Sequence, residues 1–244
     1  MPRCSARGWL QALADLIFPP QCLGCGTALP ASIPPIFCPQ CLAQLPWITA
    51  PLCTCCGTPF RAGTSHICGA CLAQPPAYSL ARSLFRYEDP LRSAILALKF
   101  QGDLTLLPSL ASLCQQAELY AHIGEPDWIV PVPLHPSRLR ERGFNQALHL
   151  ARACFPQWRQ RIAPLLLHRV LHTAPQSSLD GSARRRNLQG AFSLGQGQQC
   201  RGKKLLLVDD VLTTGTTVLA CSRVLRQGGA AQVEVFTLAR SVIL

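Results

Sequence analysis

The sequence contains little lysine, few acidic residues and no long apolar run. Only 3 of the 23 basic residues are Lys, and 12 acidic residues leave a formal net charge of +11. No apolar run approaches the roughly 18 residues that a transmembrane helix needs, so we expect no membrane span. An extended charged block is also missing, and 48% of the residues are hydrophobic, which excludes a largely disordered chain. At 244 residues the chain can form one α/β domain and a small accessory domain.

A signal peptide is not expected either. A basic segment precedes an apolar stretch at residues 9–18, but Gln11 and Asp15 interrupt this stretch and no small-residue cleavage site follows it. We therefore expect an amphipathic N-terminal helix at residues 1–20 and a cytoplasmic protein.

The most informative stretch is residues 203–229. Residues 205–208 form a short continuous apolar run, typical of a strand buried on both faces of a parallel sheet. This run ends at Asp209 and Asp210, two adjacent carboxylates that packing does not explain. Apolar residues then recur at helical spacing over residues 218–225, so we expect a strand, an acidic pair, a turn and a helix in that order.

The turn consists of Thr213, Thr214, Gly215, Thr216 and Thr217. Its glycine permits an unusual backbone angle, and hydroxyl groups together with the free N–H groups of a helix N-terminus suit a phosphate. The two aspartates could hold the hydroxyls of a ribose. No lysine follows the glycine, which argues against the P-loop of a nucleoside triphosphatase. The alternative is a helix capped by one of the threonines, with solvated aspartates.

Residues 22–71 contain two similar halves, each with two Cys-x2-Cys pairs. The cysteines are Cys22, Cys25, Cys38 and Cys41 in the first half and Cys53, Cys56, Cys68 and Cys71 in the second. The pairs are separated by 12 and 11 residues, which indicates a repeat of about 30 residues. Four thiolates complete a tetrahedral shell, so we expect two structural Zn²⁺ sites in a domain at residues 21–76. Disulfides and cross-braced pairing are alternatives, and Cys55 and His66 are further possible ligands.

Arginine is concentrated in the remainder, which we expect to form a second domain at residues 77–244. Ten arginines but only two acidic residues lie between positions 138 and 186, an excess that would attract pyrophosphate. The planar guanidinium suits phosphate groups, and Arg138 and Arg142 are the candidates; an ordinary basic surface is the alternative. Lys99 ends a helical pattern, which by itself indicates a cation at a helix C-terminus. Further strands are expected at residues 83–87, 128–133 and 233–238.

Residues 208–217 resemble the 5-phosphoribosyl-1-pyrophosphate (PRPP) loop of type I phosphoribosyltransferases. Four other segments are similar to the ComF/GntX branch of such proteins. They are Val130-Pro131-Val132-Pro133, Arg142-Gly143-Phe144-Asn145-Gln146, Thr173-Ala174-Pro175-Gln176 and Arg186-Asn187-Leu188-Gln189-Gly190-Ala191-Phe192. The resemblance implies an α/β fold with a mostly parallel sheet flanked by helices, preceded by a small zinc-ribbon-like domain. It also implies a mobile loop over the substrate, for which residues 172–190 are the candidate.

The resemblance further implies Mg²⁺-dependent phosphoribosyl transfer from PRPP, linked to DNA uptake (competence) or DNA utilisation. Asp209 and Asp210 would be catalytic, and the PRPP site would also include the turn at residues 213–217, Lys99, Arg138 and Arg142. No segment identifies the acceptor. A second hypothesis is therefore a non-catalytic adaptor that senses PRPP or phosphate, or that binds single-stranded DNA or proteins of the DNA-uptake machinery.

Overall fold

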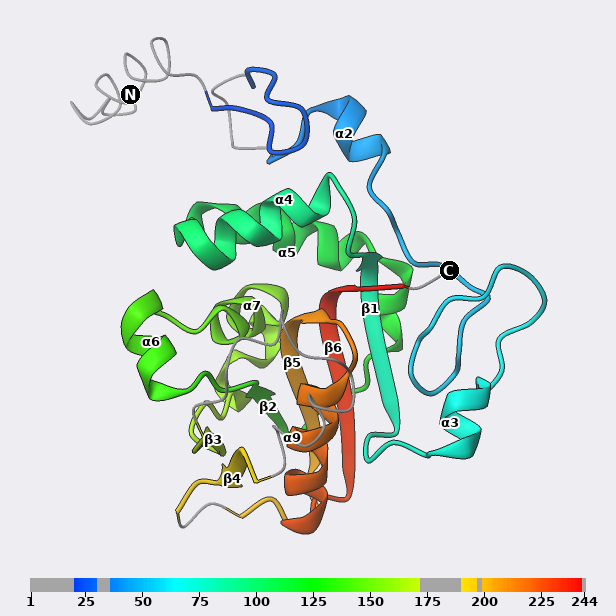
Figure 1. The fold of residues 1–244 in the computed structure, drawn as a ribbon, viewed down its shortest axis with the longest axis vertical. Helices are drawn as coiled ribbons and strands as arrows, with labels where there is room; N and C mark the ends of the chain where they lie inside the picture. Colours follow the sequence, from blue (N-terminus) through cyan, green and yellow to red (C-terminus); the bar gives the residue numbers. More distant parts are fainter. Residues whose placement is uncertain (1–19, 30–35, 172–189, 197–198, 243–244) are drawn as a thin grey trace.

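A sheet of four parallel strands forms the centre of the molecule (Figure 1). This computed structural model describes residues 20–29, 36–171, 190–196 and 199–242. The strand order is β1–β6–β5–β2. The strands are β1 (Leu80–Arg86), β2 (Trp128–Pro131), β5 (Lys204–Leu212) and β6 (Gln232–Arg240). The apolar run at 205–208 is buried in the middle of this sheet, as expected for a strand covered on both faces.

Three helices cover one face of the sheet (Figure 1). They are α4 (Leu91–Leu96), α5 (Leu107–Gln116) and α7 (Gln146–Cys154). Their apolar side chains share one core with Leu206 and Val208 of β5 and Phe236 of β6. Helix α4 continues directly into a π-helix, η1 (Ala97–Gln101), which ends at a left-handed Gly102 with a φ of 68°. Three short 3₁₀ helices, η2 (Leu104–Leu106), η3 (Glu118–His122) and η4 (Pro156–Arg161), complete the connections.

A second core lies on the opposite face. Helix α9 (Thr216–Gln227) packs there beside the antiparallel pair β3 (Leu167–Arg169) and β4 (Phe192–Leu194). Leu205 and Leu207 of β5 point into this core, whereas Leu206 and Val208 point into the first. This alternation is the period of two that strand geometry imposes. Helix α6 (Pro136–Arg142) follows β2 and leads into α7.

The two cysteine-rich halves contact different parts of this framework. Their short helices are α2 (Pro39–Ala43) and α3 (Gly69–Ala73), and Figure 1 shows α2 near α4 and α3 near β1. The first half contributes apolar side chains such as Phe37 to the α4 core. The second half is tied to β1 through the backbone, because the Ala81 amide donates a hydrogen bond to the Cys55 carbonyl at 2.7 Å.

The expected architecture is confirmed, but some elements extend further than the sequence pattern indicated. Strand β5 continues to Leu212, so Asp209 and Asp210 lie inside the strand instead of after it. The first and last strands begin earlier than expected, at Leu80 and Gln232, and β6 extends to Arg240. The helix expected at residues 1–20 and nearly all of the loop expected at 172–190 lie outside the described residues. Within the described ranges, no helix has both the length and the apolar character needed to cross a bilayer.

Candidate functional site

The predicted site residues gather near the carboxyl ends of β2 and β5. Pro131 at the end of β2 pairs with Val208, directly before Asp209 and Asp210. The chain after β2 therefore enters α6 beside the acidic pair, while the chain after β5 forms the turn that leads to α9. In open α/β sheets, ligands bind at this edge, outside the carboxyl ends of the strands.

Asp210 is a buried carboxylate with two polar neighbours. Its side chain is 5% exposed, and its Oδ2 lies 3.5 Å from Lys99 Nζ and accepts a hydrogen bond from Gln146 Nε2 at 3.3 Å. Arg142 Nη1 in turn donates to Gln146 Oε1 at 2.6 Å. Two predicted cations, Lys99 and Arg142, are thus connected to Asp210, one directly and the other through Gln146.

Asp209 lies in a different environment. Burial and the neighbouring Asp210 carboxylate raise the pKa of Asp209 to about 7, although the Asp210 amide, Lys99 and Arg169 act in the opposite direction. The contacts of Asp210 come from η1 and α7, whereas Asp209 interacts electrostatically with Arg169 of β3 and Cys221 of α9. The two carboxylates therefore leave β5 toward opposite faces, as adjacent strand residues do.

The turn before α9 presents hydroxyls and amides at the same edge. Gly215 has a φ of 75°, in the left-handed region that favours glycine, and it precedes a helix of 12 residues without a side-chain cap. Thr213 and Thr214 are exposed, and the Thr214 and Thr216 hydroxyls lie 2.8 Å apart. The alternative of a threonine cap is therefore wrong for this helix. Its first amides are available to an anion.

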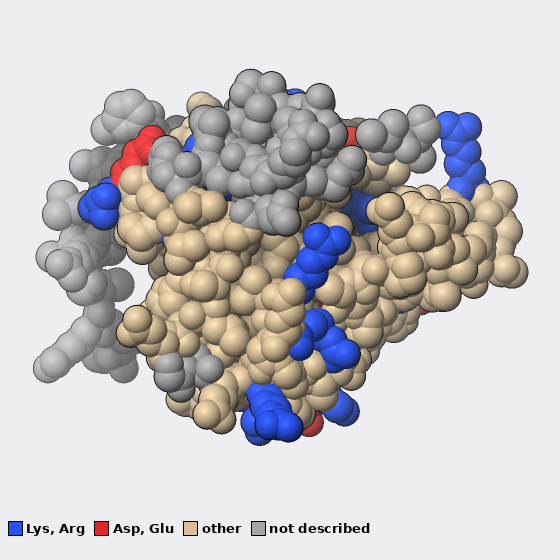
Figure 2. All heavy atoms as spheres, turned by 60° about the horizontal axis from the view of Figure 1, so that its bottom comes forward, with Lys and Arg blue, Asp and Glu red and all other residues tan. Residues whose placement is uncertain are grey.

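A group of arginines faces the acidic pair. Arg138 and Arg142 are one turn apart on α6, and burial, together with Arg138, lowers the pKa of Arg142 while Asp210 raises it. Arg169 on β3 interacts electrostatically with both Arg138 and Asp209. Figure 2 shows the face that comes forward from the bottom of Figure 1. Several basic side chains and few acidic side chains are visible on it. Arg184, Arg185 and Arg186, which belong to the same arginine-rich stretch of sequence, lie outside the described residues.

Sequence reasoning did not single out three residues that the structure brings to this edge. Gln146 belongs to the segment at residues 142–146, and Arg169 belongs to the arginine-rich region, but neither was predicted as a site residue. Phe100, next to Lys99 in η1, is 72% exposed, and the Arg142 guanidinium lies 5.8 Å from its ring centroid. A π-helix is rare and frequently found at functional sites, but apolar spacing does not distinguish it from the end of an α-helix.

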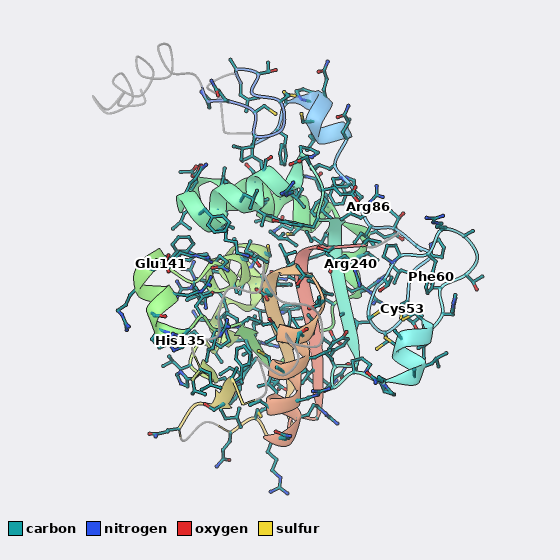
Figure 3. All side chains as sticks on the ribbon, viewed as in Figure 1. Cys53, Phe60, Arg86, His135, Glu141 and Arg240 are labelled. Atoms are coloured by element: carbon teal, nitrogen blue, oxygen red, sulfur yellow. The ribbon has the colours of Figure 1, made fainter. Side chains whose placement is uncertain are left out.

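His135 and Glu141 lie at opposite ends of α6 (Figure 3). His135 Nδ1 accepts a hydrogen bond from the Ser137 amide at 3.2 Å and lies 2.7 Å from the Ser137 hydroxyl, so it caps the helix. These contacts give His135 a structural role.

The eight predicted metal ligands form two separate tetrads. In each, all four sulfur atoms lie within 4.8 Å of one another. The Cys25 and Cys38 sulfurs are 3.7 Å apart, and those of Cys56 and Cys68 are 3.8 Å apart. A tetrahedron with Zn–S bonds of about 2.3 Å has edges of about 3.8 Å, so the thiols fit a structural Zn²⁺ ion. Each tetrad comes from one half of the repeat, which excludes the cross-braced alternative.

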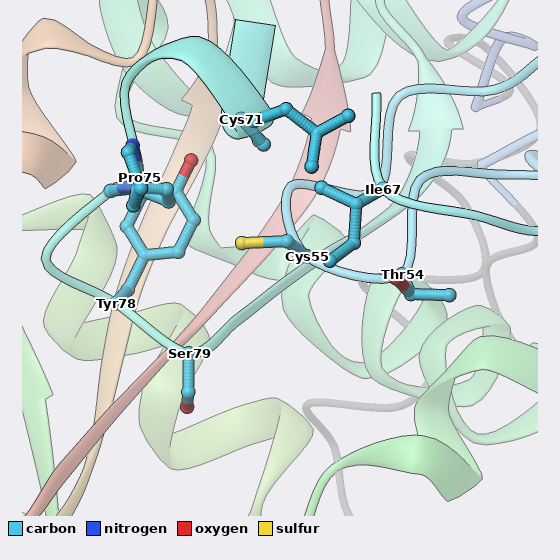
Figure 4. A pocket seen from close by; sticks show the side chains of 9 residues that line it. Thr54, Cys55, Ile67, Cys71, Pro75, Tyr78 and Ser79 are labelled. Carbon is cyan, nitrogen blue, oxygen red and sulfur yellow. The ribbon is translucent and has the colours of Figure 1, made fainter. Parts of the chain in front are cut away.

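Cys55 and His66, the alternative ligands, belong to neither tetrad. The His66 ring stacks on Phe60, with centroids 4.2 Å apart. Cys55 lies in a pocket beside the second tetrad, together with Ile67, Pro75 and Tyr78 (Figure 4). Burial raises the pKa of the Cys55 thiol, which disfavours its reactive thiolate form.

Comparison with known proteins supports the description of both the cysteine-rich part and the α/β part of the chain. The family "Double zinc ribbon domain" matches residues 13–72, and the family "Phosphoribosyl transferase domain" matches residues 173–241. Cysteine tetrads followed by a parallel sheet with this turn thus define the class: a phosphoribosyltransferase-type domain preceded by a double zinc ribbon.

More specifically, the chain belongs to the ComF family. It is 35% identical over 198 residues to Competence protein F of Haemophilus influenzae, covering 78% of this chain and 85% of that protein. It is 36% identical over 200 residues to DNA utilization protein YhgH of Escherichia coli (strain K12), with coverage of 78% and 85%. A structure of glutamine PRPP amidotransferase from B. subtilis, complexed with ADP and GMP, is 23% identical, with a TM-score of 0.34, and the match covers 55% of this chain and 26% of that one.

Proposed function

We propose that this chain binds PRPP with Mg²⁺ and transfers the phosphoribosyl group to an acceptor. The observation that best supports this is the arrangement at the carboxyl end of β5. A buried carboxylate contacted by Lys99 and Gln146 lies in the last part of this strand, which ends at a turn that leads into an uncapped helix N-terminus. Such an edge combines a partner for sugar hydroxyls with partners for phosphate.

Each part of PRPP has a partner in this proposal. The 5′-phosphate binds the amides and hydroxyls of residues 213–217, and Asp209 and Asp210 contact the ribose hydroxyls. Arg138 and Arg142 neutralise the pyrophosphate as its bond to C1′ breaks and the acceptor forms the new bond. Because positive charge develops on the sugar and negative charge on the leaving group, catalysis relies on positioning and electrostatics.

The acidic pair also suits Mg²⁺. Carboxylate oxygens are ligands that Mg²⁺ prefers, and a cation would relieve the repulsion that contributes to the raised pKa of Asp209. Bound by Asp209 or Asp210, Mg²⁺ would supply positive charge for the pyrophosphate. In the proposed complex, the Lys99 ammonium group, which contacts Asp210 in this structure, then contacts a phosphate oxygen instead.

Phe100 bears on the choice of acceptor. Its exposed ring follows Lys99 in the same π-helix and lies 5.8 Å from the Arg142 guanidinium. A planar acceptor could stack on this ring, whereas an aliphatic amine would gain little from it. We therefore place planar acceptors first in the panel of compounds to be tested.

The experiment is isothermal titration calorimetry of the metal-loaded full chain with PRPP and Mg²⁺. We expect binding to wild type and its loss when Asp209→Asn and Asp210→Asn are combined. Glu118→Gln, an exposed acid on η3, is the matched control and should bind as wild type does. Unchanged affinity in the double variant would refute the site.

The second candidate function is that of a non-catalytic adaptor. To distinguish it from a transferase, pyrophosphate release from PRPP is measured in the presence of a panel of planar bases and amines. Release with any of these acceptors supports a transferase. Intact PRPP binding without release supports the adaptor.

The names of the relatives lead us to propose a role in competence or DNA utilisation, with single-stranded DNA or DNA-uptake proteins as candidate partners. We place this role in the cytoplasm, where thiol ligands stay reduced.

A further inference from the structure

Two arginines are buried at the β1 side of the sheet without an acidic partner. Arg82 of β1 is 7% exposed and Arg240 of β6 is 8% exposed. No ion pair to either is found among the described residues, and both Nε atoms lack a hydrogen-bond partner there. Burying a cation is costly unless a negative charge compensates it. Glu234 interacts electrostatically with Arg82 without forming an ion pair, and Cys53, Cys55 and Cys56 interact with Arg82 more strongly. A negative charge at these cysteines would therefore stabilise the buried guanidinium group.

Both guanidinium groups are directed at the second cysteine tetrad. Arg82 Nη2 donates to the Thr54 carbonyl at 3.2 Å, and Arg240 Nη1 donates to the Cys56 carbonyl at 2.6 Å. These two carbonyls belong to the Cys53–Cys56 turn, which supplies two of the four ligands. Figure 3 shows Arg240 and Cys53 on the β1 side of the molecule, away from α6.

A hydroxyl connects one arginine to a ligand sulfur. Arg240 Nη2 donates to Thr58 Oγ1 at 2.8 Å, and the same oxygen lies 3.1 Å from Cys56 Sγ. Because Thr58 Oγ1 accepts from the arginine, its own proton is available for the sulfur. Arg240 thus orients a hydrogen-bond donor toward the Cys56 sulfur, the kind of contact to a ligand atom that tunes metal affinity.

Among the residues that the structure describes, the first tetrad lacks this arrangement. Thr27 occupies the position equivalent to Thr58, with its Oγ1 3.2 Å from Cys25 Sγ. However, the sequence contains no Lys or Arg between Arg7 and Arg61, and the sulfur contacts of the described first half come from amides, a hydroxyl and other sulfurs. Two copies of one repeat therefore have the same ligands but different surrounding charge.

We propose that Arg82 and Arg240 are the counter-charges of the anionic metal–thiolate centre formed by the second tetrad, which makes the two metal sites unequal. A divalent ion with four thiolates has a formal charge of −2, which two guanidinium groups balance. The second site therefore holds its metal more tightly than the first. Metal loss there protonates the thiols and leaves two cations buried without compensation, so it also weakens the β1–β6 edge.

The test measures metal release from the full-length, zinc-loaded chain with a chromogenic chelator, pyridylazoresorcinol. We expect two phases in wild type. Arg82→Gln and Arg240→Gln should accelerate the slow phase by about tenfold or more, the range of second-shell effects on metal affinity. Arg61→Gln, an exposed arginine in the same half, is the control and should release metal as wild type does. Equal rates in wild type and both buried-arginine variants would overturn the proposal.

A second pair of variants tests the contact of Thr58 with the Cys56 sulfur, with less risk to folding. Thr58→Val should accelerate release from the second site more than Thr27→Val accelerates release from the first. Equal effects, or a larger effect of Thr27→Val, would contradict the proposal.

A third readout separates a counter-charge from ordinary hydrogen bonding. Urea denaturation should show that Arg240→Gln destabilises the zinc-loaded chain but not the metal-free chain, because only the former has a negative charge to compensate. Equal destabilisation of both forms would show that the arginine acts only through its carbonyl contacts.

Discussion

At the scale of the residue, the adjacent carboxylates of β5 have different environments. Asp210 has a cation and an amide donor as neighbours, whereas Asp209 is half-buried beside another carboxylate, and Lys99 and Arg169 act on it at longer range. Adjacent positions in a strand point to opposite faces, so this difference follows from backbone geometry. Asp209, whose pKa is raised to about 7, is thus suited to gain or lose a proton near neutral pH.

Removing the cation beside Asp210 should cost more stability than removing one from an exposed pair. Lys99→Met leaves a buried carboxylate with neutral donors only, the Gln146 amide and the Val211 backbone N–H, and we expect a loss of about 1–2 kcal/mol in the free energy of unfolding. Lys203→Met is the matched control, because Lys203 Nζ also lies 3.5 Å from an aspartate oxygen, that of Asp127, but both side chains are over 40% exposed. The control should lose about 0–1 kcal/mol. Urea denaturation of both variants measures the difference, and equal losses would contradict it.

The raised pKa of Asp209 predicts a specific dependence of stability on pH. An acid whose pKa rises from about 4 in the unfolded chain to about 7 binds its proton more tightly when folded. The free energy of unfolding then falls as pH rises through this window. Asp209→Asn removes this effect, so the variant should gain stability relative to wild type between about pH 4 and pH 7.

Asp127 provides a control of opposite sign. A backbone hydrogen bond from Lys204 lowers the pKa of Asp127, so its contribution is present at neutral pH and is lost as pH falls through the lowered value. Asp127→Asn should therefore be less stable than wild type at neutral pH, and the difference should shrink in acid. The same trend for both variants would contradict the assignment for Asp209.

The residues of the acidic pair and the turn could be predicted from sequence because their chemistry is local. Strand, carboxylates, hydroxyls and glycine follow one another within ten positions, and the fold keeps them together. Gln146 and Phe100 could not be predicted in the same way. Gln146 reaches Asp210 only because α7 packs on β5, and the exposure of Phe100 depends on how η1 is oriented against α6.

At the scale of the element, the two Cys-x2-Cys turns that begin the halves of the repeat differ in what they touch. Gly26 and Gly57 both have positive φ, at 74° and 71°. A Cβ at Gly26 would meet nothing within 4 Å, whereas a Cβ at Gly57 would lie 2.5 Å from the Ala81 carbonyl oxygen of β1. The second glycine therefore serves two purposes, the turn itself and close packing on the sheet.

Alanine substitution should separate these purposes. Gly26→Ala should cost about 1–2 kcal/mol, the penalty of left-handed backbone for a residue with a side chain. Gly57→Ala should cost more, because the added methyl group must also push the turn away from β1. Thermal denaturation of the zinc-loaded variants measures both changes. A larger loss for Gly26→Ala would show that the contact with β1 does not matter for stability.

Element types were predictable from periodicity, whereas their ends were not. Residues 205–208 read as a buried strand, but the sheet extends β5 to Leu212 because Leu212 pairs with Arg240 of β6. That pairing spans a long sequence separation, which no local pattern contains. The spacing of the cysteines predicted two tetrads, yet only the assembled fold shows that β1 and β6 supply the charges beside one of them.

At the scale of the whole molecule, positive charge is large and unevenly distributed. Two filled four-cysteine sites, each formally −2, would lower the net charge from +11 to +7. Arg138, Arg142 and Arg169 then add a local positive field near the acidic pair. Such a field attracts anionic ligands over a range set by the ionic strength.

Binding of PRPP should therefore weaken with added salt. We expect its affinity to fall between about 0.05 and 0.5 M NaCl, since the Debye length shrinks severalfold over this range. Arg138→Gln should lower the affinity and reduce its dependence on salt, whereas Arg61→Gln, on the cysteine-rich half, should change neither. Fluorescence or calorimetric titration at several salt concentrations provides the measurement. A salt slope that is the same for Arg138→Gln and wild type would contradict a role for Arg138 in attracting the ligand.

The internal repeat has a consequence for how the protein would respond to scarcity of zinc. Two copies of one ligand pattern that began alike now contact different surroundings, and only the second contacts buried cations that belong to the sheet. As free zinc declines, the chain would pass through a form with one ion, in which the second half is still assembled on β1. A repeated ligand pattern with unequal surrounding charge would thus give a molecule with one dispensable and one obligatory ion.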